Sequence, residues 1–275
     1  MSLLDISFTQ GEINSFLNRI ECDFTEPSVQ QLFSIVSGII EHIPFQNISM
    51  LTNEWVRPTN QMIKHDMLSG LGGLCTVRNP FLHEFLKCLG YNVRLASSTM
   101  NEPDCHITLI VELDQHEWWV DVGNGYPYME PVMLGDEKEK SNWFMKYKLN
   151  HEFGRFQVYH KINDHDWELN HHFSPKPVDF TAFDRMHELH YSVPGWGPFL
   201  IGLRVNRFWS NGGAIIRNER ASSPDGTCEI ETDTDLQHWL KKWFTKPGFV
   251  DSIDIKKANQ TWKKEKRKWN IVNKN

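Results

Sequence analysis

The fold is decided by the segment Leu71-Gly72-Gly73-Leu74-Cys75-Thr76-Val77-Arg78-Asn79-Pro80 of this 275-residue sequence. Its two glycines allow a tight turn and a close approach of the backbone to a ligand, and they bring Cys75 to the start of an apolar-periodic segment. Backbone N–H groups at the start of a helix favour an anion, so Cys75 is a candidate nucleophile. Asn79-Pro80 is also a good N-cap and first-position pair, so the regular helix could instead begin four residues later. The structural alternative is a buried cysteine in a glycine-rich turn.

Helical periodicity is present on both sides of this segment. Thr9 and Ser28 each precede a run of apolar residues at helical spacing, and residues 81–89 form one apolar face after the cysteine. Cys88, seven residues after the first apolar residue of that face, is predicted to be buried on it. The first part of the chain is therefore predicted to be helical.

From Tyr91 onward the apolar period changes from 3.6 to 2, which is typical of strands. Strands are predicted at residues 92–97, 106–111 and 117–122, with shorter strand-like pieces at 156–159, 167–169, 213–216 and 227–230. A helix opened by Asp235 follows them. The middle of the chain is therefore predicted to be mostly β.

The predicted hairpin decides whether His106 and Asp121 can meet. If residues 114–115 form a two-residue loop, Thr108 pairs with Asp121, and His106 becomes a diagonal neighbour on the same face, roughly 7–8 Å away at Cα. That spacing suits a hydrogen bond between an imidazole and a carboxylate. A three-residue loop would place the two side chains on opposite faces. With the two-residue loop, the sequence predicts Cys75 as nucleophile, His106 as its base and Asp121 as the group that orients the base.

Two other groups of residues are candidate binding sites. The loop after Asp121 contains Gly123 and Gly125, which permit close approach of a ligand, but it lacks the spacing of a phosphate-binding loop. The pairs His171-His172 and His187/His190 have no matching third ligand, so no metal site is predicted.

Composition is that of an ordinary globular protein, with 40% apolar residues and a formal charge of −6. No apolar run approaches 18 residues, and the N-terminus lacks a signal-like core, so no membrane partner is expected. Five cysteines occur without a C-x-x-C pair, which argues against a disulfide framework and favours reduced thiols. These features predict a cytoplasmic protein.

The C-terminal end is strongly basic. The last 20 residues carry eight Lys or Arg against one acid, Glu265. This pattern favours a solvated terminal helix, and nucleic-acid binding is the weaker alternative.

Several of these motifs resemble those of the arylamine N-acetyltransferases. The family's Arg-Gly-Gly-x-Cys-x-Glu-x-Asn signature is similar to residues 71–79, and its Pro-Phe-Glu-Asn motif is similar to Pro44-Phe45-Gln46-Asn47. The strand 106–111 and the loop 120–125 resemble the family's histidine strand and its Val-Asp-Val-Gly-Phe-Gly loop. The motifs occur in the family's order.

The resemblance implies an α+β fold with a cysteine-protease-like arrangement of Cys75, His106 and Asp121. A helical bundle over residues 1–90 would carry the cysteine, a barrel-like antiparallel β domain over 91–195 would carry the histidine and aspartate, and an α/β lid would follow over 196–275.

The resemblance also implies ping-pong acetyl transfer without a metal. Cys75 would accept acetyl from acetyl-CoA, and a small-molecule amine acceptor, namely an arylamine, hydrazine or hydroxylamine, would attack the thioester. The loop residues Gly123, Asn124, Gly125 and Tyr126 would contact CoA. The oligomeric state is left open.

Four positions depart from the family pattern. Leu71, Gln46 and Val77 replace an arginine and two glutamates, and Asn124 replaces a phenylalanine, which predicts a more polar acceptor pocket. Two alternatives therefore stay open: a cysteine-dependent acyl-CoA hydrolase or amide synthase that uses the same triad, and a non-catalytic binding module.

Overall fold

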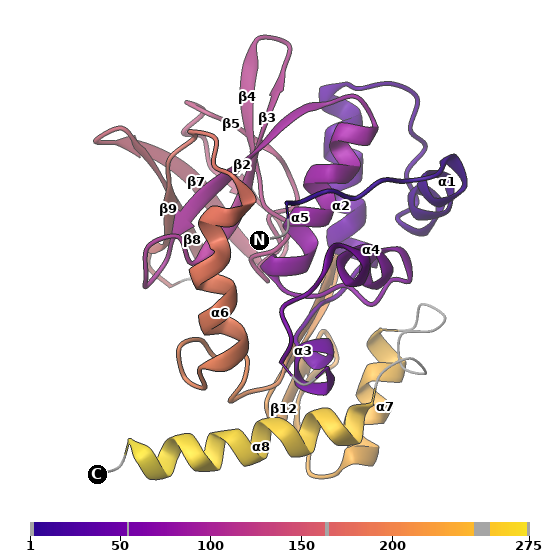
Figure 1. Ribbon diagram of the computed structural model, residues 1–275, viewed down its shortest axis with the longest axis vertical. Helices are drawn as coiled ribbons and strands as arrows, with labels where there is room; N and C mark the ends of the chain where they lie inside the picture. The colour runs from indigo at the N-terminus through magenta and orange to yellow at the C-terminus, as the bar shows by residue number, and fades with distance from the viewer. Residues whose placement is uncertain (1–2, 54, 163–164, 245–253, 274–275) are drawn as a thin grey trace.

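The computed structural model describes residues 3–53, 55–162, 165–244 and 254–273. Helices dominate the N-terminal part, and two antiparallel sheets of eight and five strands follow (Figure 1). The α+β class is thereby confirmed. None of the helices in these ranges is both long and apolar enough to cross a lipid bilayer.

The described residues of the N-terminal part form five helices, of which the first two begin where the sequence places their caps. They are α1 (Gln10–Arg19), α2 (Val29–His42), α3 (Ile48–Thr52), α4 (Asn60–Leu68) and α5 (Cys75–Cys88). The Thr9 side chain accepts a hydrogen bond from the backbone of Glu12 in a reciprocal capping box, and Ser28 caps α2 in the same way without the reciprocal bond. The apolar faces meet through aromatic rings of α1 and α5, with the Phe16 ring 4.8 Å from that of Phe81.

Helix α5 begins at Cys75 and contains Pro80, so the alternative start at Asn79 is wrong. The Arg78 N–H donates to the Leu74 carbonyl, which closes the first turn around the cysteine. Asn79 does not cap a helix because its side chain bonds the neighbouring sheet instead. The cysteine therefore lies at the N-terminal end of a regular helix.

The eight-stranded sheet is curled and has the order β5-β4-β3-β2-β9-β8-β7-β6. Its strands are β2 (Asn92–Thr99), β3 (His106–Leu113), β4 (His116–Val120), β5 (Val132–Met133), β6 (Lys140–Ser141), β7 (Met145–Glu152), β8 (Arg155–Ile162) and β9 (Glu168–Phe173). On one face Ile107 and Leu109 share a core with α5, and on the other Ile110 and Trp119 belong to a second core. Both faces are buried around β3, so the sheet holds that strand rigidly.

The β3–β4 hairpin has the predicted two-residue loop. Leu113 pairs with His116, and the loop residues Asp114 and Gln115 have φ angles of 52° and 62°. Two positive φ values are typical of a type I′ turn, whose twist matches the flanking strands. The register therefore places His106 and Asp121 on the same face.

The five-stranded sheet joins distant parts of the chain in the order β1-β10-β11-β12-β13. Its strands are β1 (Phe45–Gln46), β10 (Arg204–Trp209), β11 (Gly212–Arg217), β12 (Arg220–Ser223) and β13 (Gly226–Glu229). Asn47, next to β1, donates to the carbonyls of Phe199 and Gly202. The Gln46 N–H of β1 also donates to the Gly73 carbonyl, so the loop that precedes Cys75 is fixed to this sheet.

The remaining helices follow the sheets. The 3-10 helix η1 (Phe180–Phe183) leads into α6 (Asp184–Ser192), which the sequence analysis missed, and α7 (Asp233–Trp243) starts two residues before Asp235 because Thr232 is its N-cap. The basic tail forms α8 (Ile255–Val272). The last basic residue of the tail, Lys274, lies outside the described residues.

Candidate active site

Cys75 is buried at the first position of α5, after a turn that requires glycine. Gly72 has a φ of 71°, and a Cβ there would lie 1.9 Å from the Pro44 carbonyl oxygen. The turn therefore packs directly on the Pro44 loop, which fixes the position of the thiol.

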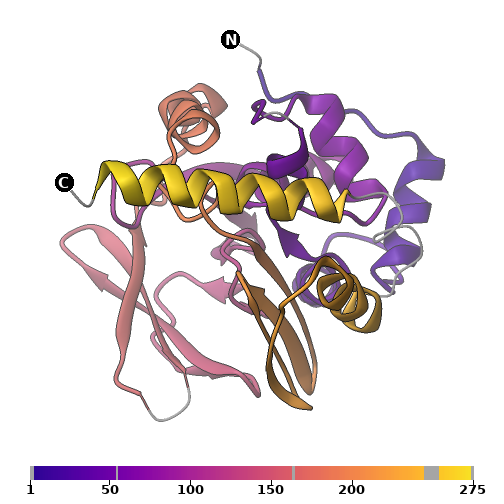
Figure 2. The same ribbon diagram turned by 90° about the horizontal axis from the view of Figure 1, so that it is seen from below.

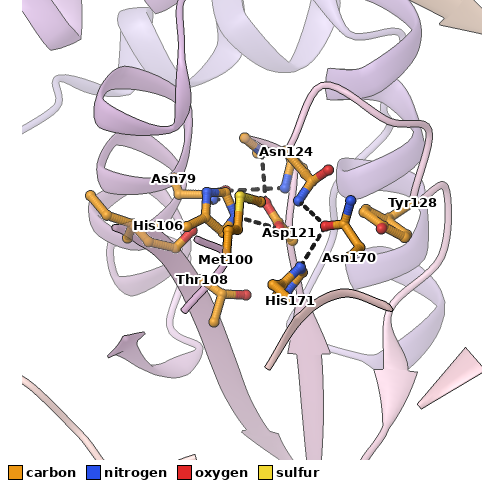
Figure 3. Close-up of polar contacts among 12 residues, drawn as sticks. Asn79, Met100, His106, Thr108, Asp121, Asn124, Tyr128, Asn170 and His171 are labelled. Carbon is orange, nitrogen blue, oxygen red and sulfur yellow. Dashed lines mark hydrogen bonds and ion pairs between the residues drawn. The ribbon is translucent and has the colours of Figure 1, made fainter. Parts of the chain in front are cut away.

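His106 and Asp121 form a buried pair beside this thiol. The His106 Nε2 lies 2.6 Å from the Asp121 Oδ2 (Figure 3). Burial alone disfavours the imidazolium, but the Asp121 charge and hydrogen bonds with Asp121 and Cys75 raise the pKa of His106 well above its usual value. Despite burial, the His106 charge and hydrogen bond lower the pKa of Asp121. The pair therefore favours an imidazolium beside a carboxylate.

The structure brings Cys75, His106 and Asp121 together as the sequence predicted. Cys75 lies close enough to His106 to help raise the pKa of the imidazole, and the backbone of Gly123 packs against Cys75, since a Cβ on Gly123 would lie 2.7 Å from the Cys75 Cα. The hairpin end and the helix start are therefore in direct contact. The catalytic roles of the three residues stay a prediction at this point.

Asn79 completes the surroundings of Asp121, a role that the sequence analysis missed. Its Nδ2 donates to the Asp121 Oδ1 at 2.9 Å and to the Ile107 carbonyl, and its Oδ1 accepts from the Val122 N–H. The Gly123 N–H donates to the same Oδ1 of Asp121 at 2.9 Å. Both carboxylate oxygens of Asp121 are therefore hydrogen-bonded, which compensates its burial.

Arg78 is a second missed residue. Its buried guanidinium donates to the carbonyls of Val122 and Ile43, so it joins the loop after β4 to the end of α2. Burial lowers the pKa of Arg78 to about 9, and the charge of Asp121 opposes the shift. The sequence contained a signal for Arg78 and Asn79, because residues three and four positions after Cys75 lie on the same side of a helix as Cys75.

The four loop residues predicted to contact CoA fall into two groups. Gly123 packs on Cys75, and Asn124 Nδ2 donates to Asn170 Oδ1 at 2.9 Å, so these two belong to the wall around the thiol. Gly125 and Tyr126 line a separate cleft of about 590 Å³ towards the five-stranded sheet. Contact with CoA stays a prediction for all four residues.

A polar wall continues behind Asn124 into the curled sheet (Figure 3). The His171 Nδ1 lies 2.7 Å from the Asn170 Oδ1, and the His171 ring centroid is 5.4 Å from that of His106. Sequence analysis considered His171 only as a metal ligand. Its burial on the same face as His106 follows from the alternation of side chains in β9.

Helix α6 contributes a further wall. The Tyr191 hydroxyl lies 2.8 Å from the Thr76 Oγ1, next to the cysteine, and the His190 ring contacts those of Trp196 and Phe199. His187 Nδ1 is bonded to the Phe183 carbonyl. Across the described ranges no group of three or more His, Cys, Asp or Glu could hold a metal ion.

The departures from the family motifs are accommodated by packing. Leu71 is buried in an apolar core, and the buried Gln46 amide bonds the Ser49 hydroxyl and N–H. The Val77 side chain fills the space beside Gly73, where a Cβ would lie 2.7 Å from it. The three neutral residues therefore leave no buried charge unpaired at these positions.

Three buried histidines predict an acid-sensitive fold. Burial is the main cause that lowers the pKa from 6.5 to about 3 for His171 and His190, and to about 4 for His187. Between these values and pH 6.5 the unfolded chain binds protons that the folded chain excludes, so stability is lost as the pH falls. We expect the free energy of unfolding to fall by about 1.4 kcal/mol per pH unit for each such histidine.

The test is urea unfolding between pH 4 and 7 of the wild type, His190→Gln and the exposed-site control His238→Gln. His190→Gln should reduce the pH slope by about one proton, whereas the control should leave it unchanged. An unaltered slope for His190→Gln would contradict this account. The contribution of His106 to the free energy of unfolding depends on pH in the opposite direction. It is lost only as the pH rises through the raised pKa of His106 in the folded protein.

Comparison with known proteins places this site in a family. A family model described as N-acetyltransferase matches residues 28–246. The arylamine N-acetyltransferase of Escherichia coli (strain K12) is 28% identical over 141 residues, which cover 47% of this chain and 46% of that protein. The arylamine N-acetyltransferase / N-hydroxyarylamine O-acetyltransferase of Salmonella typhimurium is 23% identical over 166 residues, which cover 57% of this chain and 59% of that protein. The chain thus spans about half the length of these curated relatives.

A solved structure supports the same grouping at the level of fold. The arylamine N-acetyltransferase of Mycobacterium marinum in complex with CoA has a TM-score of 0.80 at 19% identity, and the match covers 92% of this chain and 98% of that one. The family match includes Cys75, His106 and Asp121 and extends over most of the chain. This chain is therefore a member of the arylamine N-acetyltransferase family.

Proposed function

We propose that this protein transfers an acetyl group from acetyl-CoA to an arylamine, hydrazine or hydroxylamine through a thioester on Cys75. The observation that carries the proposal is the thiol of Cys75 beside the buried His106–Asp121 pair, at the start of α5. Membership of the family and a relative solved in complex with CoA support the donor. We assign catalytic roles to these three residues.

Before the first half-reaction the thiol proton of Cys75 has passed to His106, as the raised pKa of the imidazole favours, and the Cys75 thiolate attacks the thioester carbonyl carbon of acetyl-CoA. The bond from that carbon to the CoA sulfur breaks, and the imidazolium returns the proton to the departing thiolate. Asp121 holds the ring and stabilises the imidazolium through the 2.6 Å contact. CoA leaves, and acetyl remains on Cys75.

In the second half-reaction the acceptor nitrogen attacks the acetyl carbon on Cys75. The nitrogen loses a proton to His106, and the cysteine sulfur leaves and regains that proton. The polar wall beside His106 includes Asn124, Asn170 and His171, so the acceptor would meet polar as well as aromatic groups. An acceptor with a second polar group would suit this wall.

We place the CoA moiety in the cleft of about 590 Å³. Its lining includes Gly125 and Tyr126 from the loop after Asp121, and Arg217 and Arg220 from the five-stranded sheet. The two exposed arginines would bind phosphate groups by charge-assisted hydrogen bonds. Arg220 is also paired with Glu229 at 3.1 Å, so Arg217 is the better candidate.

We also propose that the reaction takes place in the cytoplasm. All five cysteines are free thiols in the structure, and persistent disulfides are rare in reducing compartments. A reducing compartment would also keep the Cys75 thiol in the reduced form that can act as a nucleophile.

The central test is intact mass spectrometry after mixing the protein with acetyl-CoA in the absence of an acceptor. We expect one acetyl group on the wild type and on Cys105→Ala, none on Cys75→Ala, and its loss when an arylamine or hydrazine is added. CoA release without a stable adduct or acceptor would identify a hydrolase. Absence of both adduct and CoA release would favour the binding module.

A second test concerns the donor. Arg217→Ala should raise the acetyl-CoA concentration for half-maximal labelling by about tenfold, since a hydrogen bond to a charged group contributes about 1.5–3 kcal/mol. The maximal labelling should stay at one acetyl group. Arg155→Ala, which removes an exposed arginine from β8, is the matched control. Equal effects of the two substitutions would disprove the assignment of the cleft.

A further inference from the structure

Helix α8 lies outside the range that matches the family, which ends at residue 246. It runs along one edge of the molecule, and seen from below it lies in front of the rest of the chain along its length (Figures 1 and 2). Trp262 is 1% exposed and packs with Ala258 in the C-terminal core. Trp269 covers Gly195, where a Cβ would lie 2.0 Å from its Nε1. The helix is therefore fixed to the body along one side.

The opposite side of α8 carries basic residues near both ends of the helix. Lys257, Lys264 and Ile271 are seven residues apart, so they form one line along the helix, and Arg267 and Lys268 lie beside it. We call this surface, with Lys256, the basic face. Because Trp262 and Trp269 hold the other side of the helix on the body, this face points outwards.

The cations of the basic face are largely unpaired. Glu265, the one acidic residue within α8, is buried and lies 2.7 Å from the Nζ of Lys268. Among the residues whose placement is described, Lys257, Lys264 and Arg267 have no carboxylate partner. The formal net charge of the whole chain is −6, although α8 contains seven Lys or Arg and only one acidic residue, Glu265. The rest of the molecule therefore carries a net negative charge, and the basic face of α8 would approach an anionic surface.

Apolar side chains are exposed at the end of the basic face. Ile271 is 68% exposed and Val272 is 75% exposed. A bilayer would bind both the basic and the apolar side chains. Its anionic headgroups attract the cations, and the boundary with the acyl chains accepts the apolar side chains. The phosphates of a nucleic acid would bind only the basic side chains.

We propose that the basic face of α8 docks this protein on anionic lipid bilayers. The headgroup charge would bind Lys257, Lys264 and Arg267, and Ile271 and Val272 would enter the interface. The protein would lie on the surface and would not cross it. This property goes beyond acetyl transfer and does not depend on Cys75.

The test is co-sedimentation of the full chain with vesicles of phosphatidylcholine alone or mixed with phosphatidylserine. We expect binding to the mixed vesicles only, and loss of binding as salt is raised. Each basic residue near such a surface changes partitioning about fivefold, so Lys264→Gln/Arg267→Gln should weaken it about 30-fold. Ile271→Ser should weaken it further.

The matched control is Lys138→Gln/Lys176→Gln, which removes the same charge from exposed sites outside α8 and should bind like the wild type. Melting temperatures of all variants should agree, since the altered side chains are exposed. Equal binding to neutral and mixed vesicles, equal losses in the control, or no vesicle binding would each overturn the proposal. Binding to single-stranded RNA in place of vesicles, unaffected by Ile271→Ser, would show that the face binds nucleic acid instead.

Discussion

The buried carboxylate of Asp121 holds the candidate site together. It contacts the His106 ring through one oxygen, and it accepts hydrogen bonds from Asn79 and Gly123 through the other. A buried charge left without partners is strongly destabilising, by about 3–5 kcal/mol when one member of a pair is removed. Strand β3, helix α5 and the loop after β4 are therefore fixed relative to one another by a single side chain.

The position of Cys75 follows from this constraint. The Asn79 amide fixes the first turn of α5 against the sheet, and Arg78 adds bonds from the same turn to Val122 and Ile43. Only glycine at position 123 allows the loop to approach the Cys75 backbone so closely. The helix start, and with it the thiol, is thereby held beside His106 at the end of strand β3.

Local sequence rules predicted much of this arrangement. The helix caps at Thr9 and Ser28 and the two-residue length of the β3–β4 loop follow from local chemistry. The loop length alone was sufficient to place His106 and Asp121 on one face of the sheet. Cys88 was wrongly predicted to be buried, because it is the last residue of α5, at the end of the apolar face, where it is exposed. The domain boundaries stay a prediction.

Non-local contacts account for what the sequence could not predict. Strand β1 pairs with β10 across more than half of the chain, and no local period indicates such a partner. Asn79 and Arg78 bond to backbone carbonyls, which carry no side-chain signature in the sequence. The outward face of α8 could be read as charged, but its fixation by Trp262 and Trp269 depends on tertiary packing.

The central claim is that the His106–Asp121 pair activates Cys75, and the rate of Cys75 alkylation by iodoacetamide at neutral pH tests it most directly. Mass mapping separates Cys75 from the exposed Cys88, which serves as the internal reference. The account predicts that Cys75 reacts faster than Cys88, and that Asp121→Asn, which keeps the shape but removes the charge, abolishes the difference. Equal rates in the wild-type protein would contradict it.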